Sequence, residues 1–416
     1  MTSHSLNVNK HLNENNHKHD HEIKLHNQPS SSIAIHDRNN PEEVKNFAFA
    51  VCREYLSGAW KKIDYNDFKV ERISGGLSNY LYRCELNKDK FKQVNNEPNA
   101  ILLRLYGENH HKHSSILLKD IIVSAIMSDH NLGPKLYGVF PNGRLEEFIN
   151  TTTMAQDDMY VPELSRSIAK VMARFHTLEM PFIKEPQWLF DSTYKYIKQA
   201  NEVSFSNEKD IKRFTKLLSF NLEHEFKKLK KILKALNSPV VFCHNDINVG
   251  NILKLPEKLM VIDYEYGSYN YRGFDLGNHF CEWMFNNNYE NHPYFQYHYE
   301  YYPNREQQIN FITSYIEEYK KAKVSKNGTN NAEDIEIDEN DKENKKDSNK
   351  LDIEQLISEA NHFALMSHIF WIFWSICQAS VCKIQFEYLE YALARCDAYF
   401  KQKKILFPNG YEANEN

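Results

Sequence analysis

The spacing of apolar residues changes near residue 150, and this change divides the chain into a β-rich part and a helical part. Apolar side chains first recur at helical spacing from Val44 to Leu56, which predicts an amphipathic opening helix. Apolar and polar residues then largely alternate, as they do in half-buried strands. We expect strands at 68–73, 80–86 and 100–106, a helix at about 116–130, and two short strands between 133 and 148. The first two strands flank a turn with two glycines, so they predict a β-hairpin.

The second part of the chain follows the helical period for most of its length. Helices are expected at 162–177, 209–236, 305–321 and from 351 nearly to 404. Two short apolar strands interrupt them, at 240–243 and 259–262. The pattern therefore predicts an α+β fold with two lobes: a small β-rich lobe at 41–150 and a larger, mainly helical lobe at 151–416.

Two segments carry too little apolar surface to pack into either lobe. Residues 1–40 are rich in His and Asn, and acids alternate with Lys and Asn at about 324–350. We expect a disordered tail and a disordered acidic insertion. The apolar stretch at 364–381 contains His368, Ser375 and Gln378. These polar residues favour a buried core helix over a membrane span.

Composition excludes several classes of function. A net charge of −5, without a basic stripe, argues against a nucleic-acid partner. Seven scattered cysteines without a C-x-x-C pair suit the reduced thiols of a cytosolic protein better than a disulfide framework or a zinc site. The first residues lack the apolar core of a secretory signal. We therefore expect a cytoplasmic protein without stable membrane insertion.

The segment from His244 to Asn251 carries the strongest chemical signal, H-x-D-x-x-x-x-N directly after an apolar strand. Phosphoryl transfer needs a carboxylate that orients and deprotonates the attacking hydroxyl, and an oxygen ligand for Mg²⁺ beside it. Asp246 and Asn251 supply both, at the spacing of the catalytic loop of protein kinases. Asp263 ends the next apolar strand and precedes Glu265, as a second Mg²⁺ ligand would. One such motif alone would be a helix cap or a turn, but the pair favours a phosphotransferase.

The β-rich part offers a weaker signal for nucleotide binding. Glycines in the turn from Ser74 to Asn79 would let backbone N–H groups approach phosphate oxygens, although such a turn is more often only a turn. Arg104 on the third strand could neutralise phosphate charge, with Asp120 as its ion-pair partner. The alternative is a surface arginine on an edge strand.

Aromatic and acidic residues gather after Asp263 and again near the C-terminus. Trp371 and Trp374 lie three apart and so share a helix face. Buried tryptophans usually belong to the core. Together with Glu282, Phe386 and Tyr391, however, these two are candidates for an aromatic box with one carboxylate, which suits a quaternary ammonium group.

These motifs, and the residues around them from about 68 to 404, resemble the choline/ethanolamine kinase family, most closely its choline kinase branch. The resemblance rests on the segments ISGGLSNYLYRCEL, ILLRLYG, LGPKLYGVFPNGRLEEFI, MPFIKEPQWLF, PVVFCHNDINVGNIL, LMVIDYEYGSYNYRGFDLGNHFCEW and YALARCDAYFKQKK. It implies a protein-kinase-like fold, ATP and Mg²⁺ as cofactors, and a homodimer. The implied reaction is the phosphorylation of choline, the first step of phosphatidylcholine synthesis.

The resemblance also implies roles for individual residues. Asp246 would be the general base, and Mg²⁺ would bind Asn251, Asp263 and, as a further ligand, Glu265. Contacts to ATP are implied for Ser74, Gly75, Gly76, Leu77, Ser78, Asn79, Tyr80, Arg104, Asn248 and Asp263, with an adenine-binding hinge at Glu147, Phe148 and Ile149. The choline pocket would comprise Tyr266, Glu282, Trp371, Trp374, Phe386 and Tyr391.

One departure from the family pattern bears on the substrate. Asn287 stands where the family's pocket uses another tyrosine, and Tyr289 follows two residues on. The amide oxygen of Asn287 would favour a primary ammonium group, so an ethanolamine kinase or a dual enzyme is the alternative. Intact Asp246, Asn251 and Asp263 argue against a regulatory pseudokinase. An aminoglycoside-type phosphotransferase would share the H-x-D loop but lack the aromatic segment at 266–283.

Overall fold

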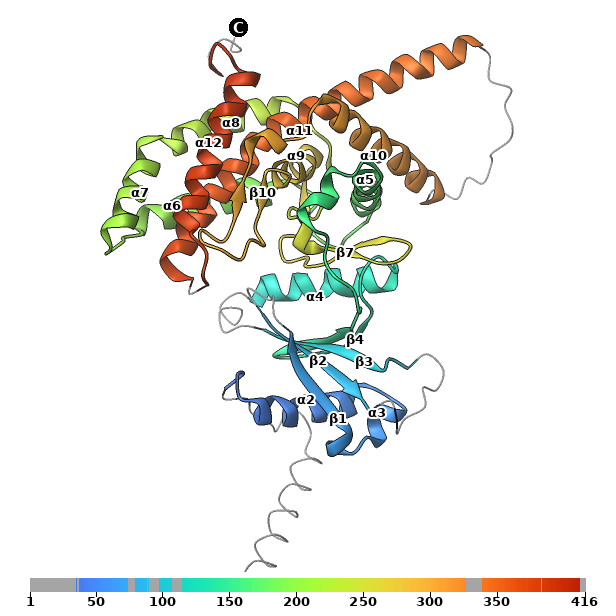
Figure 1. Ribbon diagram of the computed structural model, residues 1–416. Coiled ribbons are helices and arrows are strands. Elements are labelled where there is room, and N and C mark those ends of the chain that lie inside the picture. The colour runs from blue at the N-terminus through green and yellow to red at the C-terminus, as the bar shows by residue number, and fades with distance from the viewer. Residues whose placement is uncertain are drawn as a thin grey trace, which may run out of the picture. The chain divides into compact units, whose positions relative to one another are not determined.

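The computed structural model describes residues 35, 37–73, 79–87, 89, 97–106, 114–326, 339–382 and 384–411. The chain divides into two compact units, Met1–Asn150 and Thr151–Asn416 (Figure 1). Residues 1–34 and 36 of the predicted tail at 1–40, the turn residues 74–78 and residues 327–338 of the predicted insertion lie outside the described residues. The end of the predicted tail is ordered where it is described, since the Arg38 carbonyl accepts the Tyr82 hydroxyl and Asn40 caps the first helix.

The first unit is built around a five-stranded antiparallel sheet in the order β1-β2-β3-β5-β4. Its strands are β1 (Phe68–Ile73), β2 (Asn79–Leu86), β3 (Ala100–Tyr106), β4 (Leu136–Phe140) and β5 (Gly143–Glu147). Figure 1 shows α2 (Pro41–Tyr55) and α3 (Ala59–Lys62) on one face of the sheet and α4 (Ser114–Asp129) on the other. The Asn40 side chain caps α2, and the apolar face of that helix is buried.

The second unit is mainly helical, and its described residues also form three short antiparallel strand pairs. The helices are η4 (Gln156–Tyr160), α5 (Pro162–His176), α6 (Gln187–Glu202), α7 (Glu208–Ser219), α8 (Leu222–Ala235), η5 (Val249–Asn251), α9 (Arg272–Glu282), η6 (Tyr299–Tyr301), α10 (Arg305–Lys326), α11 (Glu339–Val381) and α12 (Tyr388–Leu406). The strand pairs are β6 (Val240–Cys243) with β9 (Ser268–Tyr271), β7 (Ile252–Lys254) with β8 (Leu259–Val261), and β10 (Phe285–Asn286) with β11 (Gln296–Tyr297).

Helices α9 and α11 form the centre of this unit and approach each other very closely. A Cβ atom on Gly277 would lie 2.3 Å from the carbonyl oxygen of Ala360 and 2.6 Å from the backbone nitrogen of Ala364. Only glycine allows this approach, because both neighbouring atoms belong to the backbone. Helix α9 is therefore fixed against the core, and it carries several residues of the site described below.

The predicted α+β architecture is confirmed, with differences in the helices. The single helix expected at 209–236 is two helices, because Asn221 adopts a left-handed conformation (φ 49°) between α7 and α8. The last predicted helix is likewise divided into α11 and α12. Helix α6 has buried residues at helical spacing that the prediction passed over. Helix α9 gave no signal, because every residue from Gly273 to Glu282 is buried and no polar face marks the period.

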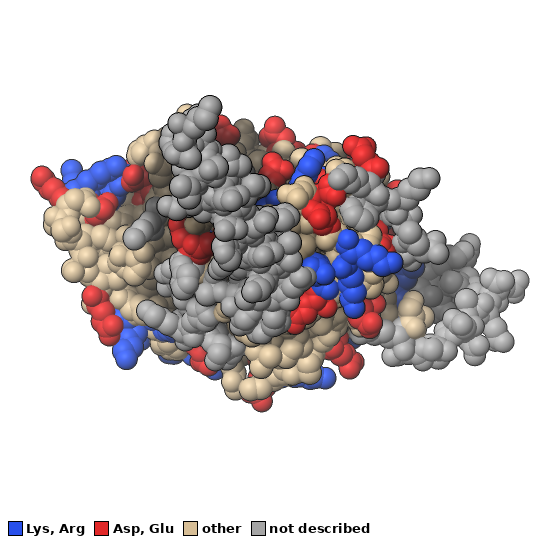
Figure 2. Space-filling view, turned by 90° about the horizontal axis from the view of Figure 1, so that it is seen from below, with Lys and Arg blue, Asp and Glu red and all other residues tan. Residues whose placement is uncertain are grey.

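The predicted insertion at 324–350 also differs where it is described. Helix α10 extends to Lys326 and α11 begins at Glu339, because Glu and Lys are good helix formers even without an apolar face. Further along α11, the segment Asp352–Val381 is long and apolar enough to cross a membrane, but 72% of its apolar 18-residue window is buried inside the fold. On the face shown in Figure 2, acidic and basic side chains of the described residues are interspersed.

Candidate active site

Two strand pairs bring the predicted catalytic loop and the predicted metal-binding loop together. The loop from His244 to Asn251 leaves β6, and the loop that begins at Asp263 leads into β9, the antiparallel partner of β6. A backbone hydrogen bond of 2.9 Å from the Ile262 N–H to the Asn251 carbonyl joins the two loops again. Neighbouring strands thus place Asp246 and Asp263 in one region of the second unit.

Asp275 on α9 holds the predicted catalytic loop through hydrogen bonds to its backbone. Its carboxylate accepts the backbone N–H groups of His244 at 2.9 Å and Asn245 at 2.8 Å. It also accepts the Nε2–H of His176 at 2.9 Å. Burial alone would raise the pKa of Asp275, but the hydrogen bond and charge of His176 lower it below its ordinary value. The buried carboxylate is therefore ionised, and two of its three hydrogen bonds hold the loop.

Asn245 holds the same loop through its side chain. Its backbone is left-handed, with φ 68°, a conformation that costs energy for any residue except glycine. Its amide nitrogen donates to the Tyr266 carbonyl and to Ser268 Oγ, both at 2.9 Å. Its amide oxygen accepts from Asn270 at 2.8 Å. These bonds compensate for the strained turn that presents Asp246.

Asp246 is held by two amide groups from its own loop. Asn248 Nδ2 donates to one carboxylate oxygen at 3.0 Å, and Asn251 Nδ2 donates to the other at 2.9 Å. Burial, together with the charges of Glu282, Asp263 and Glu265, raises the pKa of Asp246 well above its ordinary value, although the Asn248 hydrogen bond opposes the shift. A positioned carboxylate with a raised pKa is suited to accept a proton.

The residues predicted to hold Mg²⁺ form a set of oxygen donors. Because the Asn251 amide nitrogen is used by Asp246, its amide oxygen is the atom that faces elsewhere. Asp263 has a left-handed backbone, with φ 68°, and is partly exposed, as is Glu265. Carboxylate and amide oxygens are the ligands that Mg²⁺ prefers, so these residues fit the ion.

The predicted aromatic box is connected to the catalytic loop through one asparagine. Tyr266 and Trp371 lie edge to face at 5.6 Å between ring centroids, and Trp371 meets Trp374 at 5.2 Å. The Trp371 indole N–H donates to Asn278 Oδ1 at 2.8 Å, and Asn278 Nδ2 donates to the Asn245 carbonyl at 3.3 Å. A wall of the box and the loop that carries Asp246 therefore share one anchor.

The remaining predicted aromatics form a second cluster that meets the first through Tyr388. Phe386 and Tyr391 lie 5.4 Å apart, and Phe386 also contacts Tyr388 at 4.9 Å. Tyr388 in turn meets Trp374 at 5.8 Å. Tyr388 was not among the predicted site residues, although its position in the sequence between the predicted aromatics Phe386 and Tyr391 was a usable signal.

Glu282 was predicted as the carboxylate that faces the ammonium group, and it has a resident partner. Arg395 on α12 forms an ion pair with it at 2.5 Å, with side-chain exposures of 1% for Arg395 and 5% for Glu282. Asn287 Nδ2 donates to the other carboxylate oxygen at 3.4 Å. The prediction missed Arg395, because one arginine on a helix is usually a surface residue.

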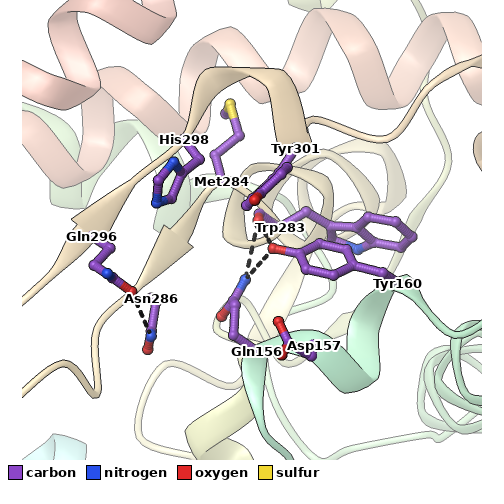
Figure 3. Close-up of a pocket in the computed structure, with 9 residues that line it drawn as sticks. All are labelled: Gln156, Asp157, Tyr160, Trp283, Met284, Asn286, Gln296, His298 and Tyr301. Atoms are coloured by element: carbon purple, nitrogen blue, oxygen red, sulfur yellow. Dashed lines mark hydrogen bonds between the residues drawn. The ribbon is translucent and has the colours of Figure 1, made fainter.

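Side-chain hydrogen bonds also hold the backbone at the end of α9, next to Glu282. Figure 3 shows Gln156 and Tyr160, both from η4, directed at this end of the helix. Gln156 Nε2 donates to the carbonyls of Glu282 at 2.9 Å and Trp283 at 3.0 Å, and the Tyr160 hydroxyl donates to Trp283 at 2.9 Å. These donors cap the last carbonyls of the helix, so Glu282 sits on a fixed backbone.

A family model described as choline/ethanolamine kinase matches residues 70–400. The chain belongs to the choline/ethanolamine kinase family. It is 41% identical over 384 residues to choline kinase alpha of Mus musculus, covering 86% of this chain and 81% of that protein. It is 42% identical over 361 residues to a choline/ethanolamine kinase of Homo sapiens, covering 86% and 85% respectively. The solved choline kinase of Cryptosporidium parvum is similar in structure, with a TM-score of 0.67, 26% identity and coverage of 88% and 96%.

The first unit contains the residues that the sequence predicted to contact ATP, and its ion pairs differ from those predicted. Arg104 pairs with Glu146 at 3.1 Å, whereas Asp120 pairs with Arg144. Arg144 also reaches Glu146 at 2.6 Å. The predicted pair between Arg104 and Asp120 is therefore wrong, because Arg144, opposite Arg104 in the register of β3 and β5, takes the Asp120 carboxylate.

Other predicted nucleotide contacts of the kinase lie at strand ends of the first unit. Asn79 and Tyr80 begin β2, directly after the undescribed turn residues. Glu147 ends β5, where its carboxylate accepts the Lys135 N–H at 3.1 Å. Phe148 follows with the guanidinium of Arg83 at 4.8 Å from its ring, and Ile149 is partly exposed. Their roles toward ATP remain predictions.

Proposed function

We propose that the protein is a choline kinase, which transfers the γ-phosphate of ATP to the hydroxyl of choline and yields phosphocholine and ADP. The observation that carries this proposal is the arrangement around Asn245. Its loop presents the paired amide donors on Asp246, and its carbonyl is tied through Asn278 to the aromatic wall at Trp371. A proton acceptor and a surface for an organic cation are thus built on one support. The curated relatives carry choline kinase and choline/ethanolamine kinase activities in their names.

In the proposed mechanism Asp246 orients and deprotonates the hydroxyl of the amino alcohol. Each carboxylate oxygen accepts one amide N–H, so the carboxylate cannot rotate and its remaining lone pairs point in fixed directions. The proton passes to Asp246 as the new O–P bond forms and the bond between the γ-phosphorus and ADP breaks. The raised pKa of Asp246 brings its basicity closer to that needed for this transfer.

Asn251, Asp263 and Glu265 would hold Mg²⁺ in this enzyme. When bound, the ion neutralises charge on the phosphates of ATP. In this arrangement Asn251 has two roles, since its amide nitrogen holds Asp246 while its oxygen is available to the metal. We also propose that the enzyme is cytoplasmic, forms a homodimer, and neither inserts into membranes nor binds nucleic acid.

We propose that the aromatic rings of the pocket make choline a better substrate than ethanolamine. A trimethylammonium group offers no N–H donors and spreads its charge over methyl groups, so it gains from the rings of Tyr266, Trp371 and Trp374. A dual choline and ethanolamine kinase is the second candidate, because the human relative is named for both substrates.

The direct test incubates the purified protein with ATP and Mg²⁺ and with choline or ethanolamine. Product is identified by phosphorus NMR, and Asp246→Asn serves as the inactive control. We expect the wild-type protein to form phosphocholine and the Asp246→Asn variant to form none. Formation of ADP without a phosphorylated amino alcohol would reject the proposed function.

A further inference from the structure

The Glu282 carboxylate already accepts hydrogen bonds on both of its oxygens. Arg395 Nη2 lies 2.5 Å from Oε1, and Asn287 Nδ2 lies 3.4 Å from Oε2. A carboxylate has about four acceptor positions, so two of them are taken before any substrate arrives. The carboxylate that the family resemblance assigns to the ammonium group therefore offers a substrate only about two acceptor positions, fewer than the three N–H donors of a primary ammonium group.

The partner on Oε1 is the Arg395 guanidinium, a full positive charge that packs against aromatic rings. The Arg395 guanidinium lies 4.1 Å from the Phe285 ring centroid and 5.0 Å from that of Tyr391. Its Nε also donates to the Tyr391 hydroxyl at 3.0 Å. Because the ion pair is almost fully buried, the charge of Glu282 is compensated inside the protein and is only weakly screened by solvent. A substrate cation thus meets a carboxylate whose attraction is reduced.

The partner on Oε2 is the Asn287 side-chain amide, and hydrogen-bond chemistry decides which of its two ends faces Glu282. With its amide reversed, Asn287 would place its oxygen against a carboxylate oxygen, two acceptors without a hydrogen between them. The nitrogen must therefore face Glu282. This reverses the expectation from the sequence, in which the Asn287 oxygen served a primary ammonium group. Asn287 instead uses acceptor capacity that such a group would need.

We propose that Arg395 and Asn287 are positioning residues that make the amine pocket discriminate by the number of N–H donors on the substrate. An ammonium group with N–H donors must leave some of them without acceptors near Glu282, and a buried donor without a partner is costly. A quaternary ammonium group has none and loses nothing. The inference rests on the proposed function, since it specifies which amino alcohols that same site accepts.

The test varies the donor number directly. Steady-state kcat/KM is measured for ethanolamine, N-methylethanolamine, N,N-dimethylethanolamine and choline, which carry three, two, one and no N–H donors. Asn287→Leu removes the amide donor and keeps a side chain of similar size, and the position is exposed. Asn288→Leu is the matched control, because Asn288 is also exposed and its backbone N–H bonds Asn286.

In the wild-type protein and in Asn288→Leu, kcat/KM should rise with each added methyl group. In Asn287→Leu the ratio of choline to ethanolamine efficiency should fall by about three- to tenfold, the order expected when one acceptor position returns to a charged group. The change should appear mainly in the KM for ethanolamine. The same ratio in all three proteins would overturn the inference while leaving the kinase assignment intact. Failure to phosphorylate any of the four amino alcohols would instead reject the proposed function.

Discussion

Single residues carry the chemistry of this kinase, and only some of them could be recognised from the sequence. The spacing of Asp246, Asn251 and Asp263 was sufficient to predict that their loops lie together, as the pairing of β6 with β9 confirms. Their roles in phosphoryl transfer stay predictions. Asp275 and Arg395 were not recognisable in this way. Their importance lies in partners distant along the chain, such as His244 for Asp275 and Glu282 for Arg395.

Replacement of Asp246 by Asn should leave the fold intact and reduce kcat by about 10²- to 10⁴-fold, the usual contribution of a general base. The amide keeps the size of the side chain but cannot accept the proton. Phosphocholine formation is measured at saturating ATP, and the free energy of unfolding shows that the variant is folded. Exposed Asp157, also in the second unit, provides Asp157→Asn as a control that should keep wild-type activity. A folded Asp246→Asn enzyme with a near wild-type kcat would remove this residue from the mechanism.

Asp275→Asn should impair both stability and rate. An amide has one oxygen for the N–H groups of His244 and Asn245, so at least one buried donor loses its partner. We expect the free energy of unfolding in urea to fall by about 1–3 kcal/mol. We also expect kcat to fall at least about tenfold, because the loop that positions Asp246 loosens. Unchanged kcat in the variant would show that the loop holds its geometry without this carboxylate.

Among the elements, those with a clear period were predictable and those buried on all sides were not. Strand β1 has the predicted bounds, because apolar and polar side chains largely alternate along it. Strand β3 has them because a short apolar run is typical of a buried strand, and its residues from Leu103 to Tyr106 are all buried. Helix α9 supplies Asp275, Asn278 and Glu282 and still left no periodic trace, since all of its residues after Arg272 are buried. The element that supports the site was thus the hardest to see in the sequence.

Gly277→Ala tests how closely α9 must lie against α11. The added methyl group would sit 2.3 Å from the Ala360 carbonyl oxygen, and neither backbone can yield without moving its helix. We expect a loss of about 1–3 kcal/mol in the free energy of unfolding, typical of overpacking. We also expect a higher KM for choline, because Glu282 and Asn278 move with α9. Thermal unfolding and steady-state kinetics measure both effects, and a variant with wild-type values for each would contradict the close contact.

At the scale of the whole molecule, each of the two units has its own buried charges, and in the first unit they set its response to acid. Burial alone would raise the pKa of Glu146, but Arg104 and Arg144 lower it to about 2. The folded first unit therefore binds a proton at Glu146 less readily than the unfolded chain does. The resulting stabilisation is complete above the ordinary glutamate pKa and is lost as the pH falls toward 2.

Glu146→Gln should therefore destabilise the protein at pH 7 more than at pH 3. A pKa lowered by roughly 2.5 corresponds to about 3 kcal/mol, and this part of the difference should shrink as the pH falls through the range between about 4.5 and 2. Unfolding is followed at both pH values, with exposed Glu71→Gln on β1 as the control. An equal loss of stability at the two pH values would mean that the Glu146 charge is not stabilising.

The hydrogen bond between Trp371 and Asn278 limits how this enzyme can be redesigned. An engineer who wishes to admit a bulkier amine would first shorten the tryptophan, and every replacement without an indole removes one of the two donors to Asn278 Oδ1, the other being Ser367 Oγ at 2.7 Å. Asn278 also holds the carbonyl of Asn245, the residue that precedes the catalytic Asp246. A broader substrate range gained at this wall would therefore be accompanied by slower turnover. Redesign should begin at walls without such a link, where a change of shape leaves the catalytic loop in place.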